Sequence, residues 1–252
     1  MPAEVKILIK GYTNADSVAE TGVEKTCPTI TLVKDKDLVM VVDPGVLPSR
    51  HVLVDALGKE NLSVEDVNFV CITHSHIDHY RNIGMFQNAR VLEFFGIWYN
   101  DTVEDWQENF TENIQIVRTP GHDYTGITLF VKTKNEIVAI CGDIFWKENY
   151  PMEDKYASEP EKLKESREMV LKMAEWIIPG HGDIYKTNKI PVPEKEKMDG
   201  AAEFFGVETV LKCRRCGKIM DKKNRCICRT WLCHHCCECG IDCDLCGCSH
   251  KK

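Results

Sequence analysis

The chain lacks a long apolar segment: none of its 252 residues belongs to a run of about 18 uncharged apolar side chains. A membrane-spanning helix needs about 20 such residues. A secretory leader needs an apolar stretch that the opening MPAEVKILIK does not contain. We therefore expect a cytoplasmic protein that neither spans a membrane nor is secreted.

Cysteine is scarce in the body of the chain, where only Cys27, Cys71 and Cys141 occur before residue 212. Cys71 and Cys141 lie inside apolar strand-like runs, and we interpret them as buried thiols. The other eleven of the 14 cysteines lie in the last 41 residues. Because we expect no secretion, this clustering favours metal binding over disulfides. No Ser-His or Cys-His arrangement in the body indicates a covalent nucleophile.

Positive charge is also scarce in the body, and the whole-chain value of −7 conceals this division. Residues 212–252 carry ten Lys and Arg against four Asp and Glu, or +6. The remainder carries 22 basic against 35 acidic residues, or −13. The sequence therefore predicts an acidic body, residues 1–188, a Pro- and charge-rich linker, 189–211, and a basic Cys-rich domain, 212–252.

Metal-binding side chains are densest in residues 73–80, THSHIDHY, where His74, His76, Asp78 and His79 form the pattern H-x-H-x-D-H. The apolar run NFVCIT before it predicts a strand, and RNIGMF after it predicts the beginning of a helix. In an extended segment His74 and His76 point to the same side and can share one ion. The following turn directs Asp78 and His79 toward a second ion. A surface loop that is merely rich in His is the alternative.

Three further candidate ligands disfavour that alternative. They are His122 in TPGHDYTG, Asp143 in AICGDIFW and His181 in IIPGHGDI, each at the end of an apolar run. A buried strand would deliver such a residue to the edge of a sheet. The glycines of PGHG permit a close backbone approach at the last ligand, or they simply form a turn.

The order of these motifs, H-x-H-x-D-H followed by a lone His, a Gly-Asp and a Pro-Gly-His-Gly, resembles the metallo-β-lactamase superfamily. Residues 5–188 carry the resemblance in the segments GYTNADS, TITLV, VVDPG, HSHIDHYRNIGMF, TPGH, GDIFW, SEPEKLKESREMVL and IIPGHG. It implies an αβ/βα sandwich, in which two mixed sheets lie back to back with helices outside.

The resemblance also implies which residues bind metal. One ion would be held by His74, His76 and His122, and the other by Asp78, His79 and His181, with Asp143 bridging the two. The ions would be zinc, with iron or manganese as the alternatives. Asp78 and Asp143 would serve the chemistry directly, and Asp43 would support the site from behind a ligand. An Asp that merely starts a turn is the alternative for Asp43.

The remaining body offers weaker signals. Ser158, followed by Pro160 and Glu161, predicts the beginning of a helix that ends near Ala174. Tyr80, Arg81 and Asn82 follow the ligand loop and either contact substrate or pack locally. Three aromatic residues in an aperiodic acidic segment either line an apolar pocket or, as we prefer, pack in the core; they are Trp98, Tyr99 and Trp106.

The tail predicts a zinc-stabilised domain. Its candidate ligands are Cys213, Cys216, Cys226, Cys228, Cys233, Cys236, Cys237, Cys239, Cys243, Cys246 and Cys248, with three interspersed histidines. At four ligands per tetrahedral ion they would hold two or three zinc ions. A basic module can bind nucleic acid, but eleven thiolates with three Zn²⁺ would reduce its charge to about +1. Contact with a partner protein is therefore the preferred role.

These observations predict a dinuclear zinc-dependent hydrolase, since two cations acidify a shared water and polarise a carbonyl or phosphoryl oxygen. The substrate would be an ester, a thioester or a phosphodiester, because a shared fold does not choose among them. The resemblance keeps open an RNA-processing endonuclease and a mononuclear iron dioxygenase. A non-catalytic metal-binding adaptor is the remaining alternative.

Overall fold

The computed structural model describes residues 1–17, 22–134, 136–148, 153–187, 211–212 and 219–220. The chain divides into two compact units, Met1–Val192 and Pro193–Lys252. In the second unit the described residues form an antiparallel pair, β15 (Leu211–Lys212) with β16 (Ile219–Met220). The cysteines from 213 to 248 that we predict to bind zinc lie outside the described residues. Among the residues that are described, no helix is long and apolar enough to cross a membrane.

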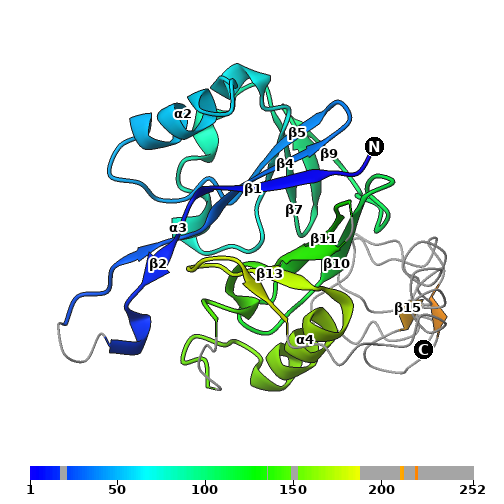
Figure 1. Cartoon of the computed structure of the whole chain (residues 1–252). Helices are drawn as coiled ribbons and strands as arrows, with labels where there is room; N and C mark the ends of the chain where they lie inside the picture. Colours follow the sequence, from blue (N-terminus) through cyan, green and yellow to red (C-terminus); the bar gives the residue numbers. More distant parts are fainter. Residues whose placement is uncertain (18–21, 135, 149–152, 188–210, 213–218, 221–252) are drawn as a thin grey trace, which may run out of the picture. The chain divides into compact units, whose positions relative to one another are not determined.

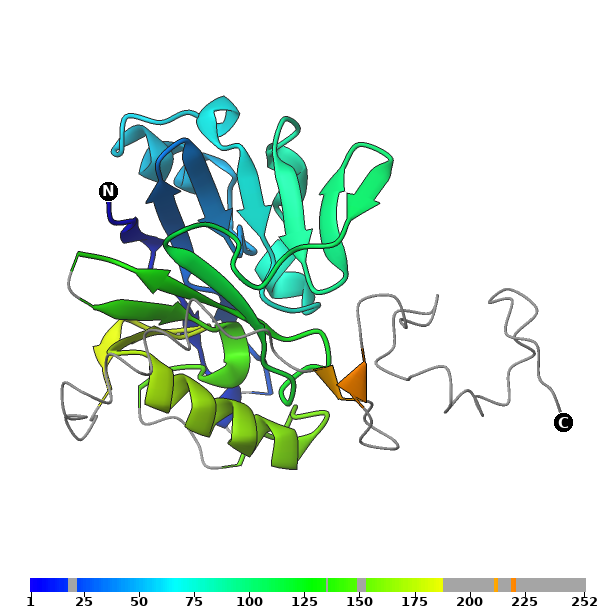
Figure 2. The same ribbon diagram turned by 90° about the vertical axis from the view of Figure 1, so that its right-hand side faces the viewer.

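Two mixed sheets make up the first unit (Figures 1 and 2). The seven-stranded sheet has the order β1 (Glu4–Ile9), β4 (Ile30–Asp35), β5 (Leu38–Val42), β6 (Phe69–Cys71), β7 (Arg90–Glu93), β8 (Gly96–Tyr99) and β9 (Thr102–Glu104). The five-stranded sheet has the order β10 (Ile114–Arg118), β11 (Ile127–Lys132), β12 (Ile137–Ile140), β13 (Trp176–Ile178) and β14 (Tyr185–Lys186). A separate hairpin pairs β2 (Tyr12–Thr13) with β3 (Thr26–Cys27).

Alternation of apolar side chains along the strands builds two cores. Val33 and Met40 point into the core between the sheets, which also contains residues of the five-stranded sheet. Their neighbours Leu32 and Val41 point to the opposite face and pack with Leu53 of helix α2 (His51–Gly58). This period of two lets one strand serve both layers. Figure 1 shows α2 outside one sheet and α4 (Pro160–Met173) outside the other, which confirms the expected sandwich.

Helix α4 lies where the sequence predicts a helix, but its capping residue differs from the predicted one. Helix α4 carries Pro160 at its beginning, as predicted, but its N-cap residue is Glu159. The Ser158 hydroxyl instead donates a hydrogen bond to the Gly121 carbonyl oxygen at 3.3 Å. Helix α3 has only four residues, Ile77–Tyr80. The described residues also form short 3₁₀ helices, which are η1 (Ala15–Ser17), η2 (Val64–Asp66), η3 (Ile83–Met85) and η4 (Gly142–Ile144).

The aromatic segment that lacks a clear period forms strands β7 to β9 and the loop after them. Trp106 is buried in the core between the sheets, as preferred from the sequence. Trp98 and Tyr99 are 42% and 47% exposed, so the expectation of core packing is wrong for both. They lie at the end of β8, in the hairpin with β9 at the edge of the seven-stranded sheet.

Candidate metal centre

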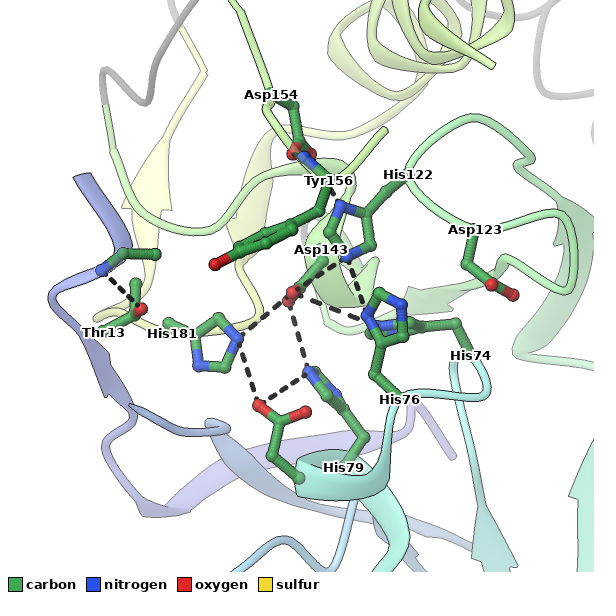
Figure 3. A network of polar contacts seen from close by, with 12 residues as sticks. Thr13, His74, His76, His79, His122, Asp123, Asp143, Asp154, Tyr156 and His181 are labelled. Atoms are coloured by element: carbon green, nitrogen blue, oxygen red, sulfur yellow. Dashed lines mark hydrogen bonds and ion pairs between the residues drawn. The ribbon is translucent and has the colours of Figure 1, made fainter. Parts of the chain in front are cut away.

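The seven predicted ligands come from loops that follow strands of both sheets. Figure 3 shows the five histidines among them and Asp143 converging on one space. His74 and His76 follow β6, and α3 then presents Asp78 and His79. The other three come from the five-stranded sheet, where His122 follows β10, Asp143 lies in η4 after β12, and His181 follows β13. Strands β12 and β13 are parallel, so their carboxyl ends deliver Asp143 and His181 to the same edge.

Four of these residues form a first group, His74, His76, His122 and Asp143, whose candidate ligand atoms lie within 4.8 Å of one another. The Nδ1 atom of His76 lies 3.0 Å from His74 Nε2 and 3.0 Å from His122 Nε2. His76 therefore points its Nδ1 atom into the group, whereas His74 and His122 point their Nε2 atoms into it. Burial lowers the pKa of His74 and of His76, which keeps both imidazoles neutral and able to bind a cation.

Asp78, His79 and His181 form a second group under the same criterion. Asp143 lies between the groups: its Oδ1 is 3.3 Å from His79 Nε2, and its Oδ2 is 3.2 Å from His181 Nε2 and 3.3 Å from His122 Nε2. Burial by itself raises the pKa of Asp143, but His181 and His79 outweigh it and hold that pKa well below its ordinary value. The carboxylate is therefore ionised and placed to contact both groups.

Two buried atoms test whether the site fits metal ions. His79 Nε2 and Asp143 Oδ1 lie 3.3 Å apart, yet neither makes a hydrogen bond with the other or with any other residue that the structure describes. Buried polar atoms are rarely left unpaired, because their desolvation then goes uncompensated. Both atoms face the space between the two groups, and imidazole nitrogen with carboxylate oxygen is a donor set that suits zinc. The residues present therefore fit a pair of divalent cations.

A ring of outer contacts orients the imidazoles. Asp43 accepts hydrogen bonds from His79 Nδ1 at 2.9 Å, from the Thr73 backbone at 2.8 Å and from the Thr73 hydroxyl at 2.7 Å. Asp154, whose side chain is fully buried, lies 2.6 Å from His122 Nδ1. Carboxylates behind a ligating histidine fix its tautomer and ring orientation. Asp43 thus lies where the sequence predicts it, behind a candidate ligand.

The second group has its own outer contacts, contributed by strand β3. The Thr26 hydroxyl donates to Asp78 Oδ2 at 2.9 Å, and His181 Nδ1 donates to the Cys27 carbonyl oxygen at 2.9 Å. Sequence reasoning missed Thr26 and Asp154. Neither residue belongs to a spacing pattern, because each reaches the site only when its segment folds back over the sheets.

Gly180 explains part of the PGHG motif. A Cβ atom at this position would overlap Asp143 Oδ1, because the Asp143 carboxylate crosses directly over the Gly180 backbone. The close approach that the sequence offered as one interpretation of these glycines therefore occurs at Gly180. Only a residue without a side chain leaves Asp143 where both groups can reach it.

A cavity of about 350 Å³ opens over the two groups. Its described lining consists of Thr13, Ala15, Glu24, Thr26, His76, Ile77, Asp78, His122, Asp143, Trp146, Tyr156 and His181. Tyr80, Arg81 and Asn82 are not in this lining, and Tyr80 packs against the outer core instead. Trp98 and Tyr99 are absent from it as well, so no described residue of the aromatic segment contributes to the cavity.

Comparisons with known proteins agree with this architecture. Residues 28–98 match a family model described as the metallo-beta-lactamase superfamily. A Xenopus laevis protein named metallo-beta-lactamase domain-containing protein 1 is 31% identical over 75% of this chain and 83% of its own length. A Methanocaldococcus jannaschii protein named "Probable metallo-hydrolase" is also 31% identical, over 58% of this chain and 73% of its own length.

Solved structures are similar in fold. A candidate metallo-beta-lactamase from Thermotoga maritima has a TM-score of 0.58 and 23% identity, covering 74% of this chain and all of its own. An N-acyl homoserine lactone hydrolase with its product at the catalytic metal centre has a TM-score of 0.54 and 15% identity, covering 78% and 95%. These structural likenesses concern the fold alone. The 31% identity to the Xenopus laevis protein, however, extends over three quarters of this chain, and we conclude that the chain belongs to the metallo-β-lactamase superfamily.

Proposed function

We propose that this metal-dependent hydrolase holds two zinc ions and cleaves a small ester or thioester. The observation that carries the proposal is the position of Asp143, which lies within 3.3 Å of nitrogen atoms from both ligand groups. A pair of bound cations supplies an acidified water and polarises a carbonyl oxygen. The chain needs no nucleophilic side chain of its own for that chemistry.

The residues divide this work between them. His74, His76 and His122 would hold one ion, and Asp78, His79 and His181 the other. The ionised carboxylate of Asp143 would contact both and offset the repulsion between them. Asp43 and Asp154 would keep His79 and His122 turned toward the ions. Asp78 is held at one oxygen by Thr26, which fixes the direction of its carboxylate at the floor of the cavity.

The cavity favours a carbonyl substrate over a phosphodiester. None of its described lining residues is Lys or Arg, so no side chain there would pair with a phosphate oxygen. Ile77, Trp146 and Ala15 provide apolar surface instead, and Glu24 adds negative charge. The volume is at the lower end of the range for small-molecule sites. Residues 1–211 carry a net charge of −13, which further disfavours a polyanion such as RNA.

Metal analysis of the purified chain tests the proposal. We expect two zinc ions in residues 1–200 and two or three more in the tail, which we continue to propose as a zinc-stabilised contact module. A body that contains a single iron would favour the dioxygenase alternative and contradict the dinuclear hydrolase. A tail without metal would remove the zinc module.

Substitution of the bridging residue tests the chemistry. Asp143→Asn should leave the chain folded but remove most hydrolysis of generic thioesters and esters, because a neutral amide bridges two cations poorly. His181→Ala should also remove most hydrolysis, because it deletes a candidate ligand of the second group. Normal turnover by either variant would show that the assigned bridge or second group is wrong. Phosphodiester cleavage that exceeds ester cleavage would redirect the proposal toward a nuclease.

A further inference from the structure

Tyr156 forms one wall of the cavity above the metal centre. Figure 3 shows its ring lying across the site between His122 and His181, on the side opposite His79. The side chain is 44% exposed, which is high for an aromatic residue that lines a cavity. No motif in the sequence marks it, and the ligand contacts described above do not use its hydroxyl.

The backbone of Tyr156 is tied to a metal ligand through Asp154. One oxygen of Asp154 accepts the Tyr156 backbone N–H at 2.8 Å, and the other lies 2.6 Å from His122 Nδ1. A single buried carboxylate therefore fixes the position of Tyr156 relative to His122. Such a link holds a side chain in register with the reacting centre, as a substrate contact requires.

The ring of Tyr156 is also held in place. It stacks on Trp146 with ring centroids 5.7 Å apart and an interplanar angle of 26°. Trp146 is buried and contacts the His122 ring edge-on at 6.0 Å. The Lys155 ammonium lies 4.8 Å from the centroid of the Tyr156 ring and donates a hydrogen bond to the Ala15 carbonyl oxygen at 2.6 Å. The direction of the phenol is thus set by packing before any ligand arrives.

The hydroxyl of Tyr156 donates a hydrogen bond to the carboxylate of Glu24, another lining residue. This bond raises the pKa of Tyr156, so the phenol stays neutral and can donate at neutral pH. Two other hydroxyls line the cavity: Thr13 accepts the Ala15 N–H at 3.1 Å, and Thr26 donates to Asp78. Among the described lining residues, Tyr156 carries the phenolic donor, and its acceptor Glu24 also lines the cavity.

We propose that Tyr156 is a substrate-contacting residue whose hydroxyl leaves Glu24 and donates a hydrogen bond to an oxygen of the bound ester or thioester. The inference rests on the proposed function and deepens it. Glu24 holds the donor in the free enzyme and competes with the substrate for it. The pocket therefore selects acyl compounds that place a hydrogen-bond acceptor at this wall while the carbonyl lies over the metal centre.

Two substitutions in the hydrogen bond between Tyr156 and Glu24, one that removes its donor and one that weakens its acceptor, distinguish this role from a structural one. Tyr156→Phe removes the donor, and we expect kcat/KM for a small ester to fall about 10- to 100-fold with the zinc content unchanged. Glu24→Gln weakens only the competing acceptor, because a bond to a charged group is roughly twice as strong as a neutral one. We expect kcat/KM for this variant to rise about threefold. Tyr12→Phe is the matched control, because Tyr12 of strand β2 is exposed and does not line the cavity.

Opposite changes in kcat/KM, a fall for Tyr156→Phe and a rise for Glu24→Gln, would support the substrate contact. If Tyr156 merely fastens Glu24 to this wall, both substitutions lower kcat/KM equally and the double variant adds nothing, which would overturn the proposal. That result leaves the proposed function intact as long as Asp143→Asn still abolishes turnover. If the unmodified chain hydrolyses no ester or thioester, both proposals are overturned together, and Asp143→Asn then changes nothing.

Discussion

Asp154 connects His122 to Tyr156 through the two oxygens of one buried carboxylate. We expect Asp154→Asn to lower the affinity of the first metal site about 10- to 100-fold, because the imidazole loses the partner that fixes its tautomer. Competition between the chain and a chromophoric zinc chelator measures this affinity. Asp55→Asn, an exposed Asp to Asn change on α2, should leave it unchanged. Equal affinities in the Asp154→Asn and unmodified chains would show that His122 needs no partner.

Thr26 should affect the second site more than the first. Its hydroxyl holds Asp78 Oδ2 and lies 3.3 Å from His181 Nδ1. Thr26→Val preserves the shape and removes the hydroxyl, so we expect the second zinc ion to bind at least tenfold more weakly while the first is retained. Thr26→Ser should restore binding. Stoichiometry by mass spectrometry under non-denaturing conditions separates the two ions. Loss of both ions together would mean that the groups do not bind independently.

Gly180→Ala should disrupt the bridge without touching a ligand. The added methyl group would overlap Asp143 Oδ1, so the carboxylate or the backbone must move. We expect loss of most activity and of at least one zinc ion. Gly84→Ala is the control, since a Cβ there meets nothing within 4 Å. Full zinc content and activity in Gly180→Ala would show that Asp143 tolerates displacement.

Cys71 provides a prediction about pH. Burial raises its pKa well above the ordinary value, so the folded chain keeps a neutral thiol where the unfolded chain ionises near pH 8.5. Between these two pKa values the unfolded state binds fewer protons, and stability is therefore lost as pH rises. We expect this group to contribute a slope of about −1.4 kcal/mol per pH unit above pH 9.

The measurement is urea unfolding at pH 7.5, 9 and 10, for the unmodified chain and for Cys71→Ala. The substitution lowers stability at every pH by removing buried volume, but its pH dependence should be shallower. The difference between the two chains isolates this thiol from the other cysteines. Parallel curves would contradict a buried, neutral Cys71.

The sequence predicted the candidate ligands better than their surroundings. His74, His76 and His181 lie in motifs whose spacing is typical of metal ligands. The structure brings these three residues together with the other four candidate ligands. Asp154 and Thr26 could not be predicted, because their positions depend on how irregular or very short segments cross the sheets. A residue that acts through a contact distant in sequence carries no local pattern.

The secondary structure follows the same rule. The strand at NFVCIT and the strands before His122, Asp143 and His181 were predicted correctly, because a short apolar run is typical of a strand buried on both faces. The hairpin of β8 and β9 was not, because its buried Ile97 is followed by the exposed aromatic residues Trp98 and Tyr99, so burial imposes no clear period there. Ser is a residue type that is favoured at helix N-caps. The Ser158 hydroxyl instead donates to the Gly121 carbonyl oxygen, a tertiary contact that outweighs the preference for capping.

The ligand groups draw on both sheets, which gives the metal ions a mechanical consequence. Residues 74–79 leave one sheet, whereas His122, Asp143 and His181 leave the other, so each divalent cation would join the two layers in addition to the apolar core between them. A chain divided in the loop between β9 and β10 would separate these layers into two fragments. Zinc would then hold the two fragments together alongside the shared apolar core, and a chelator would weaken their association.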